Sequence, residues 1–418
     1  MVLSRSVKTS IFLAGLGLVL AACTSVVTDE LDPTPTNVPT PTDVDGDEIL
    51  TPTPEDTSDE VDDPDRKDPF EGIRLRFNPA YWPNTDFNKH SVDYSEIFSG
   101  GPPPDGIPAI DSPEFESVEE SDRWLQEDWP VMFFELNGEA RAYPLVILIY
   151  HEIVNDVVGD EPVALTFCPL CNSTIAFDRT LDDGRVLDFG TTGNLRNSDL
   201  VMYDRQTQSW WQQFTGEAIV GELTGTSLTI LPSQIIAWSD FKESFPDGSV
   251  LSRNTGHFRP YGQNPYSGYD TIDSNPFFPV EGEDDRLLPK ERVVAIELDD
   301  QEVAYPFSFL GEVQVVNDVI EETPIVVFWK GGTVSGLGNE GQEIGSTGVF
   351  ERDLDGQELT FVIQDGEFFD EQTGSTWNIL GESIEGPLTG QSLERVVSAE
   401  HFWFAWAAFK PDTIVRGL

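Results

Sequence analysis

The segment Cys168-Pro169-Leu170-Cys171 holds two of the three cysteines in this 418-residue chain, and the third is Cys23. The residues just before it, 162–167, are rich in β-formers and predict a buried strand that ends at the first thiol. Two thiols separated by two residues can chelate a soft metal, exchange disulfides or close a short disulfide. The chemistry of the chain is therefore expected at this turn.

His151 lies upstream of the two thiols and adds an imidazole to them. Thiolates and imidazoles suit soft and borderline ions, so we predict a copper or zinc site formed by His151, Cys168 and Cys171. Zinc prefers four ligands, and the further candidates by chemical type are Asp204, Met202 and His257. The alternative for His151 is a hydrogen-bonded histidine in the core between strands.

The same cysteines support two other functions. Thiols outside the cytoplasm tend to oxidise, which would make the chain a thiol–disulfide redox protein. A thioredoxin-like fold is disfavoured, because Cys171 is followed by Asn-Ser-Thr-Ile-Ala-Phe-Asp, which predicts a turn and a strand instead of a helix. The third reading is a structural disulfide in a non-catalytic envelope binding or scaffold protein. Whether the protein is an enzyme stays open at this stage.

The N-terminus has the pattern of a processing signal. Two basic residues precede the apolar run 11–20, which is too short for a stable membrane span. Leu20-Ala21-Ala22-Cys23 resembles the lipobox of bacterial lipoproteins, so we predict a signal peptide over 1–22 and lipidation of Cys23. Residues 23–68 are acidic and rich in Thr and Pro, which predicts a disordered tether. The protein is expected outside the cytoplasm, anchored to the cell membrane by its lipid.

The net charge of the chain is −51, and the acidic excess continues after the tether. Such a field repels phosphate, so nucleic acid is not expected as a partner. The membrane is the one partner that the sequence predicts, through the lipid on Cys23, and we expect a monomer. The sequence identifies no protein partner and no substrate.

Two stretches of the chain repeat each other. Ala142-Tyr143-Pro144 recurs as Ala304-Tyr305-Pro306, and Val154-Asn155-Asp156-Val157 recurs as Val316-Asn317-Asp318-Val319, both at an offset of 162. Later matches follow in the same order, such as Thr207, Ser209 and Trp211 with Thr373, Ser375 and Trp377, and Trp238 with Trp403. So many ordered matches indicate an internal duplication. At the same offset Cys168 faces Lys330, so the reactive residues belong to the first copy alone.

Each copy has the pattern of a mainly β structure. In the first, strands are predicted at 131–136, 140–143, 153–158, 163–167, 174–181, 185–189, 200–203, 209–214, 218–223 and 227–231, and short helices at 144–149 and 239–245. We therefore predict a mainly β (α+β) fold with two duplicated, antiparallel β-barrel or sandwich-like lobes, each with one or two short helices. The predicted segments are a lead-in over 69–128, repeat 1 over 129–252, a Pro/Tyr-rich connector over 253–290 that packs across the lobe interface, and repeat 2 over 291–418.

In combination, several motifs resemble those of the DUF3179 family of extracytoplasmic bacterial and archaeal proteins. They are Ser99-Gly-Gly-Pro-Pro-Pro-Asp105, Arg141-Ala-Tyr-Pro144, His151-Glu-Ile-Val-Asn-Asp156, Phe167-Cys-Pro-Leu-Cys171, Phe189-Gly-Thr-Thr-Gly193 and Pro265-Tyr-Ser-Gly-Tyr269. The resemblance extends from about residue 95 to the C-terminus. It implies little about activity, because the family has no assigned function.

Overall fold

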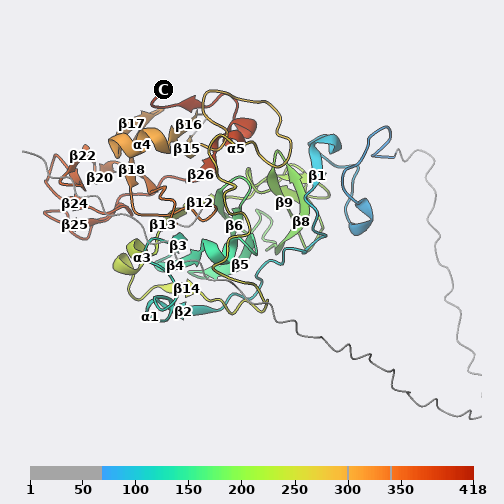
Figure 1. Ribbon diagram of the computed structural model, residues 1–418, viewed down its shortest axis with the longest axis horizontal. Coiled ribbons are helices and arrows are strands. Elements are labelled where there is room, and N and C mark those ends of the chain that lie inside the picture. Colours follow the sequence, from blue (N-terminus) through green and yellow to red (C-terminus); the bar gives the residue numbers. More distant parts are fainter. Residues whose placement is uncertain (1–67, 299–300, 339–340) are drawn as a thin grey trace, which may run out of the picture. The chain divides into compact units, whose positions relative to one another are not determined.

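The computed structural model describes residues 68–298, 301–338 and 341–418. The predicted signal peptide, the lipidation residue Cys23 and the tether up to residue 67 lie outside the described residues. Within the described part of the chain, no helix is both long and apolar enough to cross a membrane. The mainly β fold class is confirmed, because most elements are strands of sheets with largely antiparallel pairing and the helices are short (Figure 1).

The first β region, residues 129–252, contributes to three sheets with the strand orders β13-β3-β4-β14-β2, β12-β7-β6-β5 and β1-β8-β9-β10-β11. Their strands are β1 Ile97–Ser99, β2 Phe115–Ser117, β3 Pro130–Leu136, β4 Glu139–Pro144, β5 Ile153–Val158, β6 Glu161–Cys168, β7 Ser173–Asp178, β8 Phe189–Arg196, β9 Asp199–Asp204, β10 Trp210–Gln212, β11 Ala218–Val220, β12 Ile230–Leu231, β13 Gln234–Ala237 and β14 Ser249–Leu251. The predicted lead-in segment supplies β1 and β2 to these sheets.

The second β region, residues 291–418, forms sheets with the orders β26-β15-β16-β27, β17-β18-β19 and β22-β23-β24-β25, and the hairpin β20-β21. Their strands are β15 Arg292–Leu298, β16 Gln301–Pro306, β17 Val315–Ile320, β18 Thr323–Lys330, β19 Ser346–Glu351, β20 Asp353–Leu354, β21 Gln357–Glu358, β22 Phe361–Gln364, β23 Glu367–Asp370, β24 Thr376–Trp377, β25 Ser383–Glu385, β26 Ser398–Phe402 and β27 Ile414–Val415. The helices of the described chain are η1 Pro79–Tyr81, η2 Tyr94–Glu96, α1 Val118–Ser121, α2 Leu145–Leu148, α3 Trp238–Ser244, α4 Phe307–Val313 and α5 Trp403–Phe409.

The second β region follows the strand order of the first. In both, a hairpin is flanked by a late antiparallel strand on one side and by a parallel strand on the other, in the orders β13-β3-β4-β14 and β26-β15-β16-β27. Side-chain contacts recur as well, since Asn155 exchanges two hydrogen bonds with the backbone of Phe189, and Asn317 does the same with Phe361, at 2.8–2.9 Å. These paired contacts support the duplication inferred from the sequence.

Local sequence signals explain most of the first region. The Asn137-Gly138 turn has positive φ at both residues and joins β3 to β4 as predicted, because this dipeptide tolerates the left-handed backbone that tight hairpins need. One strand prediction is wrong. A strand was predicted at 185–189, whereas the structure has β8 from Phe189 to Arg196. Its alternation is hidden by an irregularity between Thr191 and Asn194, where Gly193 has a φ of +71°. The position of β8 matters for function, because the turn between β8 and β9 lies beside Cys168 and Cys171.

The two β regions pack against each other through equivalent strands. β13 of the first region contacts β19 of the second, and β26 of the second contacts β7 of the first. β13 and β26 hold the same place in their sheets, and so do β19 and β7. A large buried cluster contains side chains from both regions, including Phe167 and Phe177 of the first and Phe402 and Trp403 of the second. The second region therefore lies directly beside the end of the strand that carries Cys168.

Candidate metal centre

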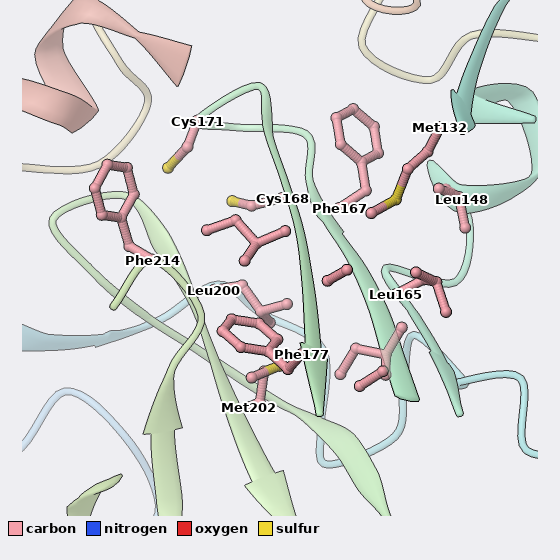
Figure 2. Packing of buried hydrophobic residues seen from close by; sticks show 14 of the residues in the cluster. Met132, Leu148, Leu165, Phe167, Cys168, Cys171, Phe177, Leu200, Met202 and Phe214 are labelled. Atoms are coloured by element: carbon pink, nitrogen blue, oxygen red, sulfur yellow. The ribbon is translucent and has the colours of Figure 1, made fainter. Parts of the chain in front are cut away.

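The two thiols lie on the tight connection between β6 and β7. β6 ends at Cys168, whose backbone partner across the hairpin is Ser173, and the Cys171 amide donates to the Cys168 carbonyl at 3.3 Å. Asn172 closes the turn with a φ of +51°. Both cysteines are free thiols and buried. Figure 2 shows their sulfur atoms on the same side of the turn, toward Phe214.

A second turn, between β8 and β9, reaches the same place. Asn197 and Ser198 both have positive φ, and Asp199 follows as the first residue of β9. The Ser198 carbonyl lies 3.3 Å from Cys171 Sγ and 3.9 Å from Cys168 Sγ. The ligand atoms of Cys168, Cys171 and Asp199 all lie within 4.8 Å of one another. This set of three buried side chains is called the thiol–carboxylate cluster below.

The carboxylate of Asp199 is only half satisfied. Its Oδ2 accepts hydrogen bonds from Gln212 Nε2 at 2.6 Å and from the Phe214 amide at 3.0 Å. Its Oδ1 is buried and has no hydrogen-bond partner among the described residues. Burial raises the pKa of this carboxyl to about 6. An ionised carboxylate with one free buried oxygen is costly unless a cation or a proton compensates it.

The surroundings of the cluster disfavour negative charge. Burial raises the pKa of both Cys168 and Cys171, so in the absence of a cation the thiols stay protonated near neutral pH. Burial, followed by the charge of Asp199, raises the pKa of the neighbouring Glu152 to about 8. A low thiolate fraction makes these cysteines poor nucleophiles. A cation bound by the cluster would reverse this preference, because it would favour the deprotonated ligands.

The connector covers the two turns. Tyr269 Oη donates to the Leu170 carbonyl at 3.0 Å, within the thiol turn, and Ser198 Oγ donates to the Phe278 carbonyl at 2.9 Å. From the second region, the Phe402 amide donates to the Cys171 carbonyl at 2.8 Å. The cluster is therefore closed by parts of the chain far apart in sequence.

His151 is not part of this cluster. Its Nδ1 lies 2.7 Å from the Pro108 carbonyl and its Nε2 lies 2.6 Å from Tyr261 Oη, so both ring nitrogens have partners. Burial lowers the pKa of this imidazole to about 4, which keeps it neutral. His257 packs beside it, with 5.6 Å between the ring centroids. Neither His151 nor His257 belongs to the group of ligand atoms formed by the two thiols and Asp199.

Asp204 and Met202 also lie outside the cluster. Asp204 Oδ1 accepts from the Thr207 amide at 2.6 Å, and its Oδ2 accepts from Thr207 Oγ1 at 2.9 Å and from Trp211 Nε1 at 3.0 Å. Met202 lies away from both sulfurs, toward Phe177, in the hydrophobic core (Figure 2). Sequence reasoning missed Asp199, because an acidic residue at the tip of a hairpin carries no signal of its own.

Replacing Asp204 with alanine is expected to lower the free energy of unfolding by about 2–3 kcal/mol, since Trp211 Nε1 loses its acceptor inside the core. Asp370 makes the same contacts in the second region, including one with Trp377 Nε1 at 3.0 Å, so Asp370→Ala is the matched variant and should cost about as much. Denaturant titrations measure both effects. The metal content should not change, and its loss from folded Asp204→Ala would return Asp204 to the list of ligands.

Comparison with known proteins adds a family and no activity. No curated protein and no solved structure matches the chain. The family model described as Protein of unknown function (DUF3179) matches residues 104–413. That span includes the first β region, the connector, the second β region up to residue 413 and every residue of the thiol–carboxylate cluster. The chain therefore belongs to the DUF3179 family.

Proposed function

We propose that the protein binds one soft or borderline metal ion, copper or zinc, through Cys168, Cys171 and Asp199. The proposal is carried by the grouping of Cys168, Cys171 and Asp199, in which one ligand atom of each residue lies within 4.8 Å of the others. The buried Oδ1 of Asp199 also has no hydrogen-bond partner among the described residues. The ligand set differs from the one expected from sequence, because Asp199 takes the place of His151.

The charge of the cluster favours a cation over the alternatives. Two protonated thiols give the free oxygen of Asp199 only weak donors. A divalent metal ion would offset two of the three negative charges of two thiolates and one carboxylate, and thiolate ligands select copper and zinc over harder ions. Three ligands suffice for a thiolate-bound copper ion, whereas zinc would take a fourth ligand. A structural disulfide between Cys168 and Cys171 would leave the Asp199 carboxylate without compensation.

The closed surroundings favour holding a metal over catalysing a reaction on it. Catalytic zinc sites keep an open position for water or substrate, whereas structural sites are closed by protein. Here the connector and the second region hydrogen-bond to Leu170, Ser198 and Cys171, around the two turns that carry the ligands. We therefore propose a stable metal site that ties these segments together.

A thiol–disulfide function is the second candidate, because the β6–β7 turn places two free thiols side by side. In that reaction a disulfide substrate would take two electrons and two protons from Cys168 and Cys171. One intramolecular S–S bond would form, and the substrate would leave as two thiols. The burial of both sulfurs and their raised pKa values weigh against this candidate.

The wider setting of the proposal comes from the sequence. The Leu20-Ala21-Ala22-Cys23 motif supports a signal peptide, a lipid on Cys23 and a position outside the cytoplasm at the cell membrane. The net charge of −51 supports the absence of nucleic acid among the partners. We propose a monomer in which two duplicated regions share one site.

The test is elemental analysis of the full chain purified without chelators. Wild-type protein is expected to carry about one copper or zinc ion per chain, and Cys168→Ser/Cys171→Ser none, since metal affinity depends on deprotonated ligands. Asp199→Asn should weaken metal affinity by about tenfold or more, measured by competition with a chromogenic chelator. His151→Gln and Met202→Leu are the matched controls and should retain the metal.

Thiol counting completes the design. Free thiols measured in the unfolded protein with and without prior reduction distinguish the candidates. Metal-free protein that gains two reactive thiols on reduction would contain a disulfide and would overturn the metal proposal. Loss of metal from folded His151→Gln, with the metal retained in Asp199→Asn, would overturn the revised ligand set.

A further inference from the structure

A cavity of about 170 Å³ lies between the two β regions. Its walls include Ile175, Phe214 and Ile230 from the first region and Ala295, His401 and Trp406 from the second. Interfaces between structural units are common places for ligand pockets. A cavity of about 150 Å³ in another protein holds a benzene molecule, so this one is large enough for a single ring.

His401 is the unusual side chain of this cavity. It is 2% exposed, and its Nδ1 has no hydrogen-bond partner within the described part of the chain. The ring packs against Phe214, with centroids 4.5 Å apart, and stacks on Trp406 at 5.5 Å. Burial lowers the pKa of the imidazole to about 3, so it is neutral near neutral pH. A buried polar atom without a partner calls for an explanation.

The first region shows what the fold requires at this position. His401 lies opposite Val293 in the pairing of β26 with β15, and Ile236 lies opposite Val131 in the pairing of β13 with β3. The two strand pairs are equivalent, so Ile236 is the counterpart of His401, and it is fully buried. An aliphatic side chain therefore satisfies the fold at this place. The imidazole adds a cost that packing alone does not explain.

The same comparison explains the cavity. Ala295 on β15 occupies the position that Phe133 occupies on β3. The Phe133 ring stacks on Phe245, with 5.0 Å between the ring centroids. The guanidinium of Arg395 lies over the Phe133 ring at 4.8 Å. At the equivalent interface, where β13 packs against β19, this space is therefore occupied by a phenyl ring and a guanidinium. At the His401 interface the small side chain of Ala295 leaves that volume open.

We propose that this cavity binds a neutral, ring-sized organic molecule whose hydroxyl or N–H group forms a hydrogen bond with His401. The apolar walls accept the ring, and a hydroxyl can donate to or accept from an imidazole in either tautomer. The charged residues of the wall offset each other, since Lys410 Nζ lies 2.5 Å from Glu297 Oε2, so a neutral ligand fits better than an ion. The cavity wall contains none of the three proposed metal ligands.

The test uses phenol and benzene as probes on the full chain, with binding measured by titration calorimetry. Wild type should bind phenol about tenfold more tightly than benzene, as expected for one added hydrogen bond. His401→Ile introduces the residue found at the equivalent position of the first region, Ile236, and should abolish this preference. The same variant should raise the Tm by about 2–4 °C, because it removes an unpaired buried polar group. Ala295→Phe should fill the cavity and prevent both molecules from binding.

Two results would overturn the proposal. One is an equal preference for phenol in wild type and His401→Ile, which would place the bound molecule away from the imidazole. The other is a lower Tm for His401→Ile, which would show that the imidazole serves the fold. Should Ala295→Phe fail to fold, the affinities of His401→Ile decide the outcome. Metal content measured on the same samples separates this result from the fate of the metal proposal.

Discussion

Replacing Asp270 with asparagine is expected to lower the free energy of unfolding by about 3–5 kcal/mol. Asp270 belongs to the connector, and its Oδ2 accepts from Arg292 Nη2 of the second region at 2.9 Å. The two side chains are 1% and 7% exposed. Removing one charge leaves the other buried without its partner, and that desolvation cost produces the large effect. Denaturant titrations of wild type and variant measure it.

The controls separate the cost of an unpaired charge from the value of the ion pair. Asp270→Leu/Arg292→Met removes both charges and should cost less than Asp270→Asn alone, because no charge stays buried without its partner. Asp183→Asn breaks an exposed ion pair with Arg185 and should change the free energy of unfolding by less than about 1 kcal/mol. A double variant that is less stable than Asp270→Asn would contradict this explanation.

The stability of the protein is expected to fall as the pH rises from about 4.5 to 7, and Glu400 is one cause. Burial raises the pKa of this carboxyl from 4.5 to about 7, although Thr347 Oγ1 donates to Oε1 at 2.9 Å. Between these two pH values the unfolded state has lost the proton and the folded state still holds it. Each pH unit in this window then costs about 1.4 kcal/mol, or about 3 kcal/mol in total.

Glu400→Gln tests this prediction, because glutamine keeps an acceptor for Thr347 and does not titrate. The free energy of unfolding of the variant, relative to wild type, should increase by up to about 3 kcal/mol between pH 5 and pH 8. Denaturant titrations at several pH values give both curves. Burial also raises the pKa of Asp199 and Glu152, so part of the pH dependence should persist in the variant. Parallel curves for variant and wild type would contradict the assignment to Glu400.

The sequence by itself determined the features that depend on neighbouring residues. Alternating apolar residues and the Asn137-Gly138 turn predicted the β3–β4 hairpin, because these signals act within a few residues. The ordered matches at an offset of 162 predicted two regions of similar design, and the strand orders agree with them. The strand before Cys168 was predicted for the same reason, and so was the closeness of the two thiols.

Only the tertiary structure decided which side chains accompany those thiols. Asp199 reaches them because β8 continues past the irregularity near Gly193 and brings a second turn to the end of β6. His151 lies nearer in sequence to Cys168, yet its nitrogens face Pro108 and Tyr261. Local patterns do not encode such pairings, since contact between distant segments depends on how whole sheets pack.

The cavity beside His401 is a second feature that local sequence patterns could not predict. In the sequence, Ala295 and His401 are ordinary strand residues, and their counterparts Phe133 and Ile236 give no sign of a difference in function. The difference becomes visible when β26 packs against β7 of the first region, because the small side chain then leaves a space and the imidazole loses water without gaining a partner. Strand identity is a local property, whereas the volume and polarity of an interface are set by both of its sides.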